Sequence, residues 1–415
     1  MSEKKVRAKY GAAAFASSVK AEFPAVFPRA MGPNCAKYLQ EIVDGGLCVD
    51  MVSRFEKAFA QAMGSKHFIG TPGCTNALHT LAAGWSYKPG DEIIVSPVSD
   101  YGTIMGLLVE NYIPVFCDTA PGSPNITAET IAPCITDRTR AILAVHKLGL
   151  PCDMDPILKL AARHKIDVYE DCCQAVFSGY KGRRVGAFGR AAGFSFDSEK
   201  SLGSDIGGGV LTSDTELAER LAFMGLSRGG VQEPGYGRRH TERGLALRMP
   251  NCTAAICLAQ LEIAEDQIVQ RDRTVRLMTK LLAGIPGIIP LVIPDYCSCF
   301  SCWMYGFSID PAAFRCSADE LAAKLNARGM PNIGLGRYYL MPESVVFLRQ
   351  YTEQNRYPFS LPPASRRHRY DAAACPNGRD FLANFVRWFW TEKYTDAHVE
   401  QMAAIIRAEA EANRK

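Results

Sequence analysis

The sequence lacks any run of about 18 uninterrupted apolar residues, the length that a membrane-spanning helix requires. Its first residues are charged and then rich in alanine, without the apolar core of a secretory signal. The sequence also lacks a strong excess of charge of one sign, because 47 lysines and arginines are nearly balanced by 43 acidic residues. This excess is too small to indicate a nucleic-acid-binding protein, although it leaves an anionic small molecule open as a ligand. We therefore expect a soluble, cytoplasmic protein.

Metal-binding patterns are sparse as well, since the seven histidines show no spacing typical of metal ligands. The segment from Cys297 to Cys302 reads CSCFSC and could supply thiolates to zinc or an iron–sulfur cluster. Both need a fourth ligand and usually a longer loop, so we favour structural cysteines. The 15 cysteines are odd in number, and Cys172 and Cys173 are adjacent within an apolar stretch. We predict reduced, mostly buried thiols and no metal site.

The chain of 415 residues is long enough for one large and one small domain. Between about residues 50 and 225, short apolar segments alternate with helical segments, which predicts an α/β fold with a mainly parallel sheet between helices. We predict an N-terminal segment at 1–45, a large domain at 46–285 and a smaller α+β domain at 286–415. The expected strands lie at 66–70, 92–96, 113–117, 141–145, 166–170, 192–196, 209–212 and 303–309, and the expected helices at 51–63, 77–85, 127–135, 154–164, 215–224, 252–284, 318–328 and 395–412.

Two further segments have a distinct character. Residues 226–250 are rich in glycine and arginine and have little periodicity, which predicts a long loop that is functional or faces a partner. Near the C-terminus, Phe381, Phe385, Trp388 and Phe389 recur at helical spacing. We interpret them as a buried helical stripe of the core rather than as a ligand site.

Lys200 lies in the segment AAGFSFDSEKSLGSDIGGG at 191–209, between a predicted strand and a glycine-rich turn. A lysine at a strand end in a crowded site loses its proton more readily and can attack an aldehyde. The glycines at 207–209 permit positive φ and close approach of the backbone to a bound group. An exposed loop lysine is the alternative, because most lysines are solvated.

Asp171 ends the apolar strand IDVYED, and ligand sites in α/β sheets lie at the carboxyl ends of strands. A carboxylate there can keep the ring nitrogen of a pyridine cofactor protonated, which lets the ring accept electrons. The alternative is that Asp171 caps a following helix.

The segment PGCTNALH at 72–79 joins a predicted strand to a helix. Backbone N–H groups at a helix N-terminus, with an added hydroxyl, form a phosphate site. Ordinary helix capping by Thr75 or Asn76 is the alternative.

At these residues the sequence resembles the DegT/DnrJ/EryC1/StrS family of sugar aminotransferases, which have the pyridoxal-phosphate fold type I. PGCTNALH resembles the family turn SGTxALH, and EDCCQA at 170–175 resembles EDAAQA. FSF at 194–196 followed by Lys200 resembles its Schiff-base segment. The resemblance covers about residues 40–265 well and the C-terminal third loosely. Further matches to its connecting loops are KPGDE at 88–92, HKLG at 146–149 and CDM at 152–154.

The resemblance implies the fold of that family and a role for each matched residue. Lys200 would hold pyridoxal phosphate as a Schiff base and shuttle a proton, and Asp171 would pair with the pyridine nitrogen. Gln174 would bond the ring hydroxyl, and Tyr101 would stack on the ring. The phosphate would be held by the turn and the lysine strand, at Cys74, Thr75, Asn76 and Ser195.

The activity implied is transamination from glutamate or glutamine to a keto-sugar or keto-cyclitol, in amino-sugar or antibiotic biosynthesis, by a ping-pong reaction. The family also includes dehydratases in which histidine replaces the lysine, and Lys200 speaks against that activity. Elimination or oxidation on the same cofactor remains an alternative. A non-catalytic relative is disfavoured because Lys200, Asp171 and Gln174 are all present. A cysteine-ligated metalloprotein is a remote alternative.

Three positions depart from the family pattern. Cys74 stands where the family usually has glycine, and Met304 where it often has histidine. Ala246 replaces an asparagine that reaches the phosphate of the neighbouring subunit. The family shares its sites between subunits, so we expect a homodimer, with no nucleic-acid or membrane partner. Three arginines of the 226–250 loop are candidates to bind an anionic part of a substrate, with solvated side chains as the alternative: Arg239, Arg243 and Arg248.

Overall fold

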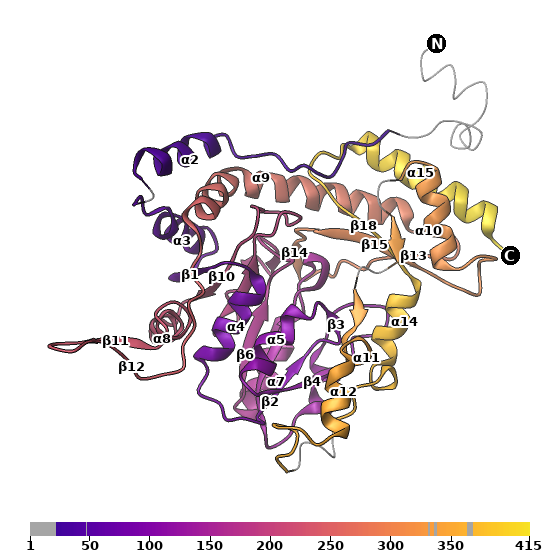
Figure 1. The fold of residues 1–415 in the computed structure, drawn as a ribbon. Helices are drawn as coiled ribbons and strands as arrows, with labels where there is room; N and C mark the ends of the chain where they lie inside the picture. Colours follow the sequence, from indigo (N-terminus) through magenta and orange to yellow (C-terminus); the bar gives the residue numbers. More distant parts are fainter. Residues whose placement is uncertain (1–21, 47, 331–332, 336–337, 363–367) are drawn as a thin grey trace.

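The computed structural model describes residues 22–415, apart from 47, 331–332, 336–337 and 363–367, so about half of the predicted N-terminal segment lies outside the described residues. A seven-stranded sheet in the order β1-β10-β9-β6-β5-β2-β4 forms its centre, and β10 alone is antiparallel to its neighbours (Figure 1). The predicted mainly parallel sheet is confirmed. Its strands are β1 (His67–Thr71), β2 (Glu92–Val95), β4 (Ile113–Phe116), β5 (Thr139–Val145), β6 (Asp167–Asp171), β9 (Ala192–Ser195) and β10 (Gly208–Thr212).

Side chains alternate between the two faces of this sheet, as the pleat of a strand requires. In β1, Phe68 packs into the cluster on one face and Ile69 into the cluster on the other. Phe194 and Phe196 pack with Phe55, Phe59 and Phe68, which fixes the strand that leads to Lys200. The helices on the Phe68 face are α3 (Met51–Ala62), α7 (Met154–His164) and α9 (Asn251–Leu282), and those on the other face are α4 (Cys74–Gly84), α5 (Gly102–Val109) and α8 (Thr215–Gly225).

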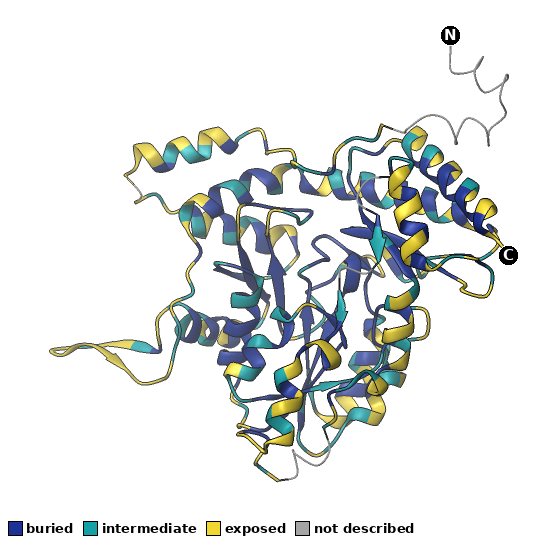
Figure 2. Cartoon of the chain, turned by 45° about the vertical axis from the view of Figure 1, so that its right-hand side comes forward, coloured by how far each residue is buried: buried dark blue, intermediate teal, exposed yellow. Residues whose placement is uncertain are grey.

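The C-terminal part has its own four-stranded sheet, in the order β13-β15-β18-β16. Its core contains Trp303, Trp388 and Trp390 and packs against the second half of α9. The strands of both sheets are largely buried, whereas most of the helices around them have one exposed side (Figure 2). The elements of this part are β13 (Ile288–Pro290), β15 (Met304–Ile309), α10 (Ala318–Ala327), β16 (Gly334–Leu335), α14 (Pro376–Asn384), β18 (Phe385–Phe389) and α15 (Asp396–Asn413).

Between β16 and α14 the chain returns to the large domain. β17 (Tyr339–Leu340) pairs with β3 (Val98–Ser99) of the large domain. Met341, Leu348 and Tyr370 then pack into the core on the α4 face of the seven-stranded sheet. A single domain boundary at residue 286 does not account for this segment, which follows the boundary in the chain but packs on the large domain. The returning helices are α11 (Met341–Ser344) and α12 (Val346–Glu353).

Two predicted elements were wrong. The 226–250 segment is not only a loop, because β11 (Gly230–Glu233) and β12 (Gly237–His240) form a hairpin that projects from the body of the molecule (Figure 1). The proposed helical stripe is divided, since Phe381 lies on α14 whereas Phe385, Trp388 and Phe389 lie on β18. All four side chains are nevertheless buried, as predicted.

The remaining elements are short or peripheral. α4 begins three residues earlier than predicted, which places its N-terminus at the PGCTN turn. Within the described ranges no helix is long and apolar enough to span a membrane. The other elements are α2 (Cys35–Asp44), α6 (Ala128–Ile131), β7 (Gly179–Tyr180), β8 (Arg183–Arg184) and β14 (Cys297–Cys299).

Candidate active site

The carboxyl ends of β1, β6 and β9 meet at one edge of the seven-stranded sheet, beside a cavity of about 320 Å³. This volume lies at the lower end of the range for cofactor and small-molecule sites. The chain order places three separate segments there, namely the turn after β1, the end of β6 and the loop after β9. The predicted site residues that line the cavity are Cys74, Thr75, Asn76, Asp171, Gln174, Ser195 and Lys200.

The N-terminus of α4 forms the end of the cavity where a phosphate is expected. The N-cap residue of α4 is Gly73, and no side chain of the described residues accepts a hydrogen bond from the first N–H groups of the helix. Capping by Thr75 or Asn76 is therefore excluded. An 11-residue helix presents its positive dipole end and its first N–H groups at this point. The arrangement suits an anion.

Glycines behind this turn are needed mainly for space. A Cβ at Gly208 would lie 2.5 Å from the carbonyl carbon of Gly73, and one at Gly209 would lie 2.2 Å from Cζ of Phe68. Among the three glycines at 207–209, Gly207 has a positive φ, of 148°, and the other two do not. The predicted use of positive φ at all three glycines is therefore wrong for two of them, which allow β10 to approach the turn closely.

Asp171 is buried at the end of β6 and accepts hydrogen bonds from the hydroxyl of Thr103 (2.9 Å) and the backbone N–H of Cys173 (3.1 Å). The bond to Cys173 closes a turn, so Asp171 does not cap a helix. Burial raises the pKa of Asp171, although these two hydrogen bonds and the charges of Lys200 and Lys147 act in the opposite direction. A protonated ring nitrogen beside this carboxylate would stabilise its charged form.

Glu170 precedes Asp171 and has a different function, because adjacent strand residues face opposite sides. It accepts hydrogen bonds from His146 and from the backbone N–H groups of Gly186, Phe188 and Gly189. Burial alone would raise the pKa of Glu170, but these hydrogen bonds outweigh it and lower the pKa. Its lone pairs are used within the fold, so Glu170 is structural.

Lys200 is partly buried and its Nζ lies 3.9 Å from the centre of the Trp303 ring. Trp303 belongs to the C-terminal part and donates from Nε1 to the carbonyl of Glu199 (2.8 Å). An amine held over an aromatic ring at a cavity is not a freely solvated loop lysine. The exposed-lysine alternative is therefore excluded.

The lysine loop is also held from behind by two buried arginines. Arg29 donates to the carbonyl of Glu199 (2.7 Å), and Arg271 donates to the hydroxyl of Ser201 (2.9 Å). Both guanidinium groups face Glu392, which lies 2.6 Å from Nη2 of Arg271. Residues on either side of Lys200 are thus fixed to Arg29, in the segment before α2, and to Arg271 on α9.

Three residues of the site were not found from the sequence. Thr103 bonds Asp171, Trp303 contacts Lys200, and Tyr338 accepts a hydrogen bond from Nε2 of Gln174 (2.8 Å). Thr103 follows the PVSDY loop that carries Tyr101, so its position two residues further on was a usable signal. Trp303 and Tyr338 come from the C-terminal third, where the resemblance is loose.

Four predicted residues are not brought into the cavity. The ring of Tyr101 packs edge-on against Phe347, with centres 6.0 Å apart, and it does not line the cavity. Arg239 pairs with Glu233 of its own hairpin (2.6 Å). The other two, Arg243 and Arg248, are exposed outside the cavity.

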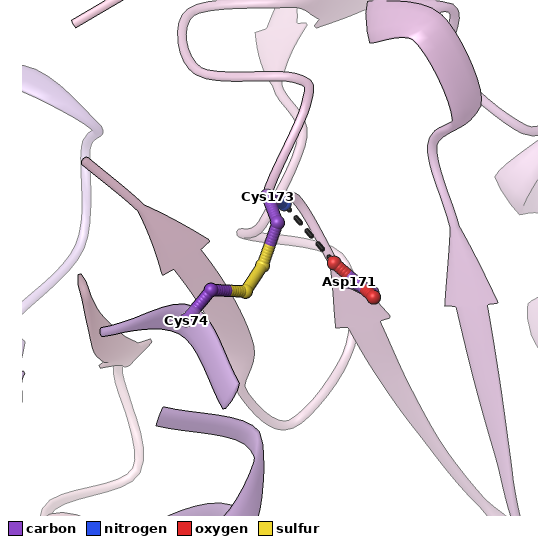
Figure 3. Close-up of side chains that lie close together, drawn as sticks. All are labelled: Cys74, Asp171 and Cys173. Carbon is purple, nitrogen blue, oxygen red and sulfur yellow. Dashed lines mark hydrogen bonds between the residues drawn. A yellow bond between two sulfur atoms is a disulfide. The ribbon is translucent and has the colours of Figure 1, made fainter. Parts of the chain in front are cut away.

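The oxidation state of the cysteines differs from the prediction at one pair. Cys74 and Cys173 form a disulfide beside Asp171 (Figure 3), so the expectation that all thiols are reduced is wrong. The other cysteines are free. Cys297, Cys299 and Cys302 do not belong to either group of converging metal-ligand atoms that the described residues form.

The site as a whole fits pyridoxal phosphate. The uncapped helix end suits the phosphate, buried Asp171 suits a protonated ring nitrogen, and Lys200 supplies the amine. Ser195 and Gln174 line the cavity between these groups.

Known proteins are similar to this chain in sequence and in fold. Residues 31–377 match the profile of the DegT/DnrJ/EryC1/StrS aminotransferase family. GDP-perosamine synthase of Caulobacter vibrioides is 38% identical over 234 residues, which are 56% of this chain and 62% of that protein. The spore coat polysaccharide biosynthesis protein SpsC of Bacillus subtilis is 32% identical over 59% of this chain and 64% of its own. The chain thus spans less than two thirds of either relative.

The fold agrees with solved structures over nearly the whole chain. The structure of 3-amino-5-hydroxybenzoic acid synthase matches with a TM-score of 0.80 and 25% identity, covering 95% of this chain and all of that one. DesV of S. venezuelae matches with a TM-score of 0.76 and 27% identity, over 91% and 94% of the two chains. The fold is that of the PLP-dependent transferases of type I. The chain belongs to the DegT/DnrJ/EryC1/StrS aminotransferase family, whose cofactor is pyridoxal phosphate.

Proposed function

We propose that this protein is an aminotransferase that moves an amino group from glutamate or glutamine to a keto-sugar or keto-cyclitol. The convergence of Lys200, Asp171 and the uncapped N-terminus of α4 on one cavity is the observation that carries the proposal. The names of the relatives, GDP-perosamine synthase and a spore coat polysaccharide biosynthesis protein, support a sugar acceptor. We place the reaction in amino-sugar or secondary-metabolite biosynthesis, including antibiotics, in the cytoplasm.

Bound pyridoxal phosphate supplies an aldehyde for the amino group and a ring that withdraws electrons from the reacting carbon. Lys200 would hold this group through Nζ, and the same amine would move a proton at the substrate carbon. Asp171 would keep the ring nitrogen protonated, and Thr103 orients the carboxylate by its hydrogen bond. Trp303 limits the space open to Nζ and excludes water from one side.

Other groups of the cavity would bind the phosphate and the ring hydroxyl of pyridoxal phosphate. The first backbone N–H groups of α4 would bind the phosphate, together with the hydroxyls of Thr75 and Ser195, which line the same cavity. Gln174 is oriented by the N–H of Leu148, which donates to its Oε1 (2.7 Å), and by Tyr338, which accepts from its Nε2 (2.8 Å), and at this cavity wall it would bond the ring hydroxyl. We retain Tyr101 as the stacking residue only if its ring turns from Phe347 when the cofactor binds.

The absorption spectrum of the purified protein tests the proposal. With pyridoxal phosphate bound, a visible band is expected, and addition of glutamate or glutamine should shift it to shorter wavelength as the amino group reaches the cofactor. A keto acceptor should then restore the band. A protein that takes up the cofactor but whose spectrum responds to neither amino acid would contradict the proposed donors.

We further propose a homodimer in which the β11–β12 hairpin contacts the partner. The hairpin leaves the body of its own chain (Figure 2), and it exposes Val231 and Tyr236, which are 42% and 67% accessible. Exposed apolar and aromatic side chains on such a projection are typical of an interface. The same geometry explains why Arg239 cannot serve its own cavity.

Arg239→Ala and Arg243→Ala are therefore expected to raise the KM for one substrate by about tenfold, because each would remove a charged hydrogen bond to an anionic group in the partner's site. The visible band should stay intact, and the effect should fade at high salt. Arg238→Ala is the matched control, since Arg238 precedes Arg239 on β12 and faces the other side.

Steady-state kinetics for donor and acceptor measure this effect, and sedimentation measures the assembly. Unchanged KM values in both variants would show that these arginines serve solubility alone. An active monomer at assay concentration would refute the homodimer.

A further inference from the structure

Cys74 and Cys173 join two segments that both contact the proposed cofactor. Cys74 is the first residue of α4, and Cys173 follows the end of β6, 99 residues later in the chain. Their Cα atoms lie 6.4 Å apart, within the range for a disulfide. The bond therefore ties the phosphate end of the cavity to the Asp171 end (Figure 3).

The pair is placed where a reagent can reach it. Both cysteines are partly exposed and both line the cavity. Cys172, the direct neighbour of Cys173, is 1% exposed, and burial raises the pKa of its thiol. A thiol that is buried and hard to ionise is unreactive, so exchange chemistry at this point in the fold belongs to Cys74 and Cys173.

Closing this disulfide has a mechanical effect on the site. The backbone N–H of Cys173 donates to Oδ1 of Asp171, so movement of Cys173 moves the group that orients the carboxylate. Cys74 carries one of the first N–H groups of α4. The closed bond holds the two segments at one spacing with both sulfur atoms at the cavity wall, and this limits how far the turn and the end of β6 can adjust around a flat ring and its phosphate.

We propose that Cys74 and Cys173 are a thiol–disulfide modification site that sets the affinity of the cavity for pyridoxal phosphate, with tight binding by the dithiol form and weak binding by the disulfide form. The inference rests on the proposed function, because it requires the cofactor in this cavity. Cofactor binding in turn favours the dithiol form, since coupling between the two is reciprocal.

The reductant is a dithiol. One of its thiolates attacks a sulfur of the pair, so that the S–S bond breaks and a mixed disulfide forms. Its second thiolate then displaces the protein sulfur. Two electrons and two protons are delivered to Cys74 and Cys173, and the reductant leaves as its own disulfide.

The test compares two cofactor-free preparations of the full chain, one air-oxidised and one treated with dithiothreitol, which is then removed without oxygen. Each is titrated with pyridoxal phosphate itself and followed by the visible band. The reduced protein is expected to bind at least about tenfold more tightly. Alkylation followed by mass spectrometry should label Cys74 and Cys173 only after reduction.

Two variants separate this effect from a general loss of structure. Cys173→Ala removes the bond, so its affinity should be the same after both treatments. Cys48→Ser is the matched control, because Cys48 is an exposed free thiol outside the cavity. It should keep the full difference between oxidised and reduced protein.

Equal affinities of the two wild-type preparations would overturn the proposal, as would tighter binding by the disulfide form or labelling of both cysteines without reductant. In each of these cases the proposed function would stand. A wild-type protein that binds no pyridoxal phosphate in either state would overturn the proposed function and the coupling together.

Discussion

Lys200→Ala is expected to lower the rate of amino transfer by about 10³-fold or more and to remove the visible band. The structure places Lys200 Nζ at the cavity, over the Trp303 ring, with its loop held by Arg29 and Arg271. Alanine keeps this loop in place, because its anchors are the neighbouring residues Glu199 and Ser201. The loss would therefore report the missing amine and not an altered fold.

Lys200→Arg should fail as well, since a guanidinium does not condense with an aldehyde at neutral pH. Lys181→Ala is the matched control, because Lys181 is an exposed lysine that pairs with Asp155. It should keep both rate and spectrum. Activity near the wild-type rate in Lys200→Ala would reject the assignment of the cofactor lysine.

Asp171→Asn is expected to leave pyridoxal phosphate bound while slowing the half-reaction with the donor on the order of 10²-fold. An amide cannot keep the ring nitrogen protonated, so the ring withdraws electrons less strongly. Thr103 and Cys173 donate to different oxygens of Asp171, so the amide oxygen can accept from Cys173 while the amide NH2 donates to the hydroxyl of Thr103, which can also act as an acceptor. Single-turnover measurements with glutamate or glutamine give this rate, and a normal rate would assign the function to another residue.

The same substitution has a defined effect on the stability of the cofactor-free protein. Burial raises the pKa of Asp171 above the value of the unfolded chain, so the folded state holds its proton more tightly. Its contribution to the free energy of unfolding therefore declines as the pH rises from about 4 through the raised pKa. Asp171→Asn should lose less stability over that range. Glu170→Gln, the neighbouring carboxylate, should instead destabilise the protein, because it weakens four hydrogen bonds.

The sequence was sufficient for the central sheet and for the polar groups at its edge. Alternating apolar and helical segments predict the parallel strands, and parallel strands bring their carboxyl ends together. Asp171, Lys200 and Thr75 therefore meet as expected, although the first and last of them are 125 positions apart in the chain (200 − 75). The order of strands and polar residues in the sequence was enough to predict this site, because each of the three residues lies at or just after the carboxyl end of a strand.

Other features depend on contacts that spacing does not encode. The position of the Tyr101 ring is set by Phe347, which lies in a segment that the sequence placed in the small domain. Trp303 and Tyr338 reach the site from the C-terminal part, where no motif marks them. The Cys74–Cys173 pairing arises only when β1 and β6 lie in one sheet, so counting cysteines could not reveal it.

The return of residues 339–362 and 368–375 to the large domain also affects how the core is completed during synthesis on the ribosome. Met341, Leu348, Phe359 and Tyr370 cover the α4 face of the main sheet, and the hydroxyl of Tyr370 donates to the carbonyl of Pro114 (2.9 Å). When residue 285 has been synthesised, α4, α5 and α8 already cover part of this face, and the remaining part stays exposed for on the order of seconds to tens of seconds until the returning segment is made. The last apolar side chains of the large domain's core are therefore added only after most of the small domain has been made, and until then apolar surface on this face is open to non-native contacts.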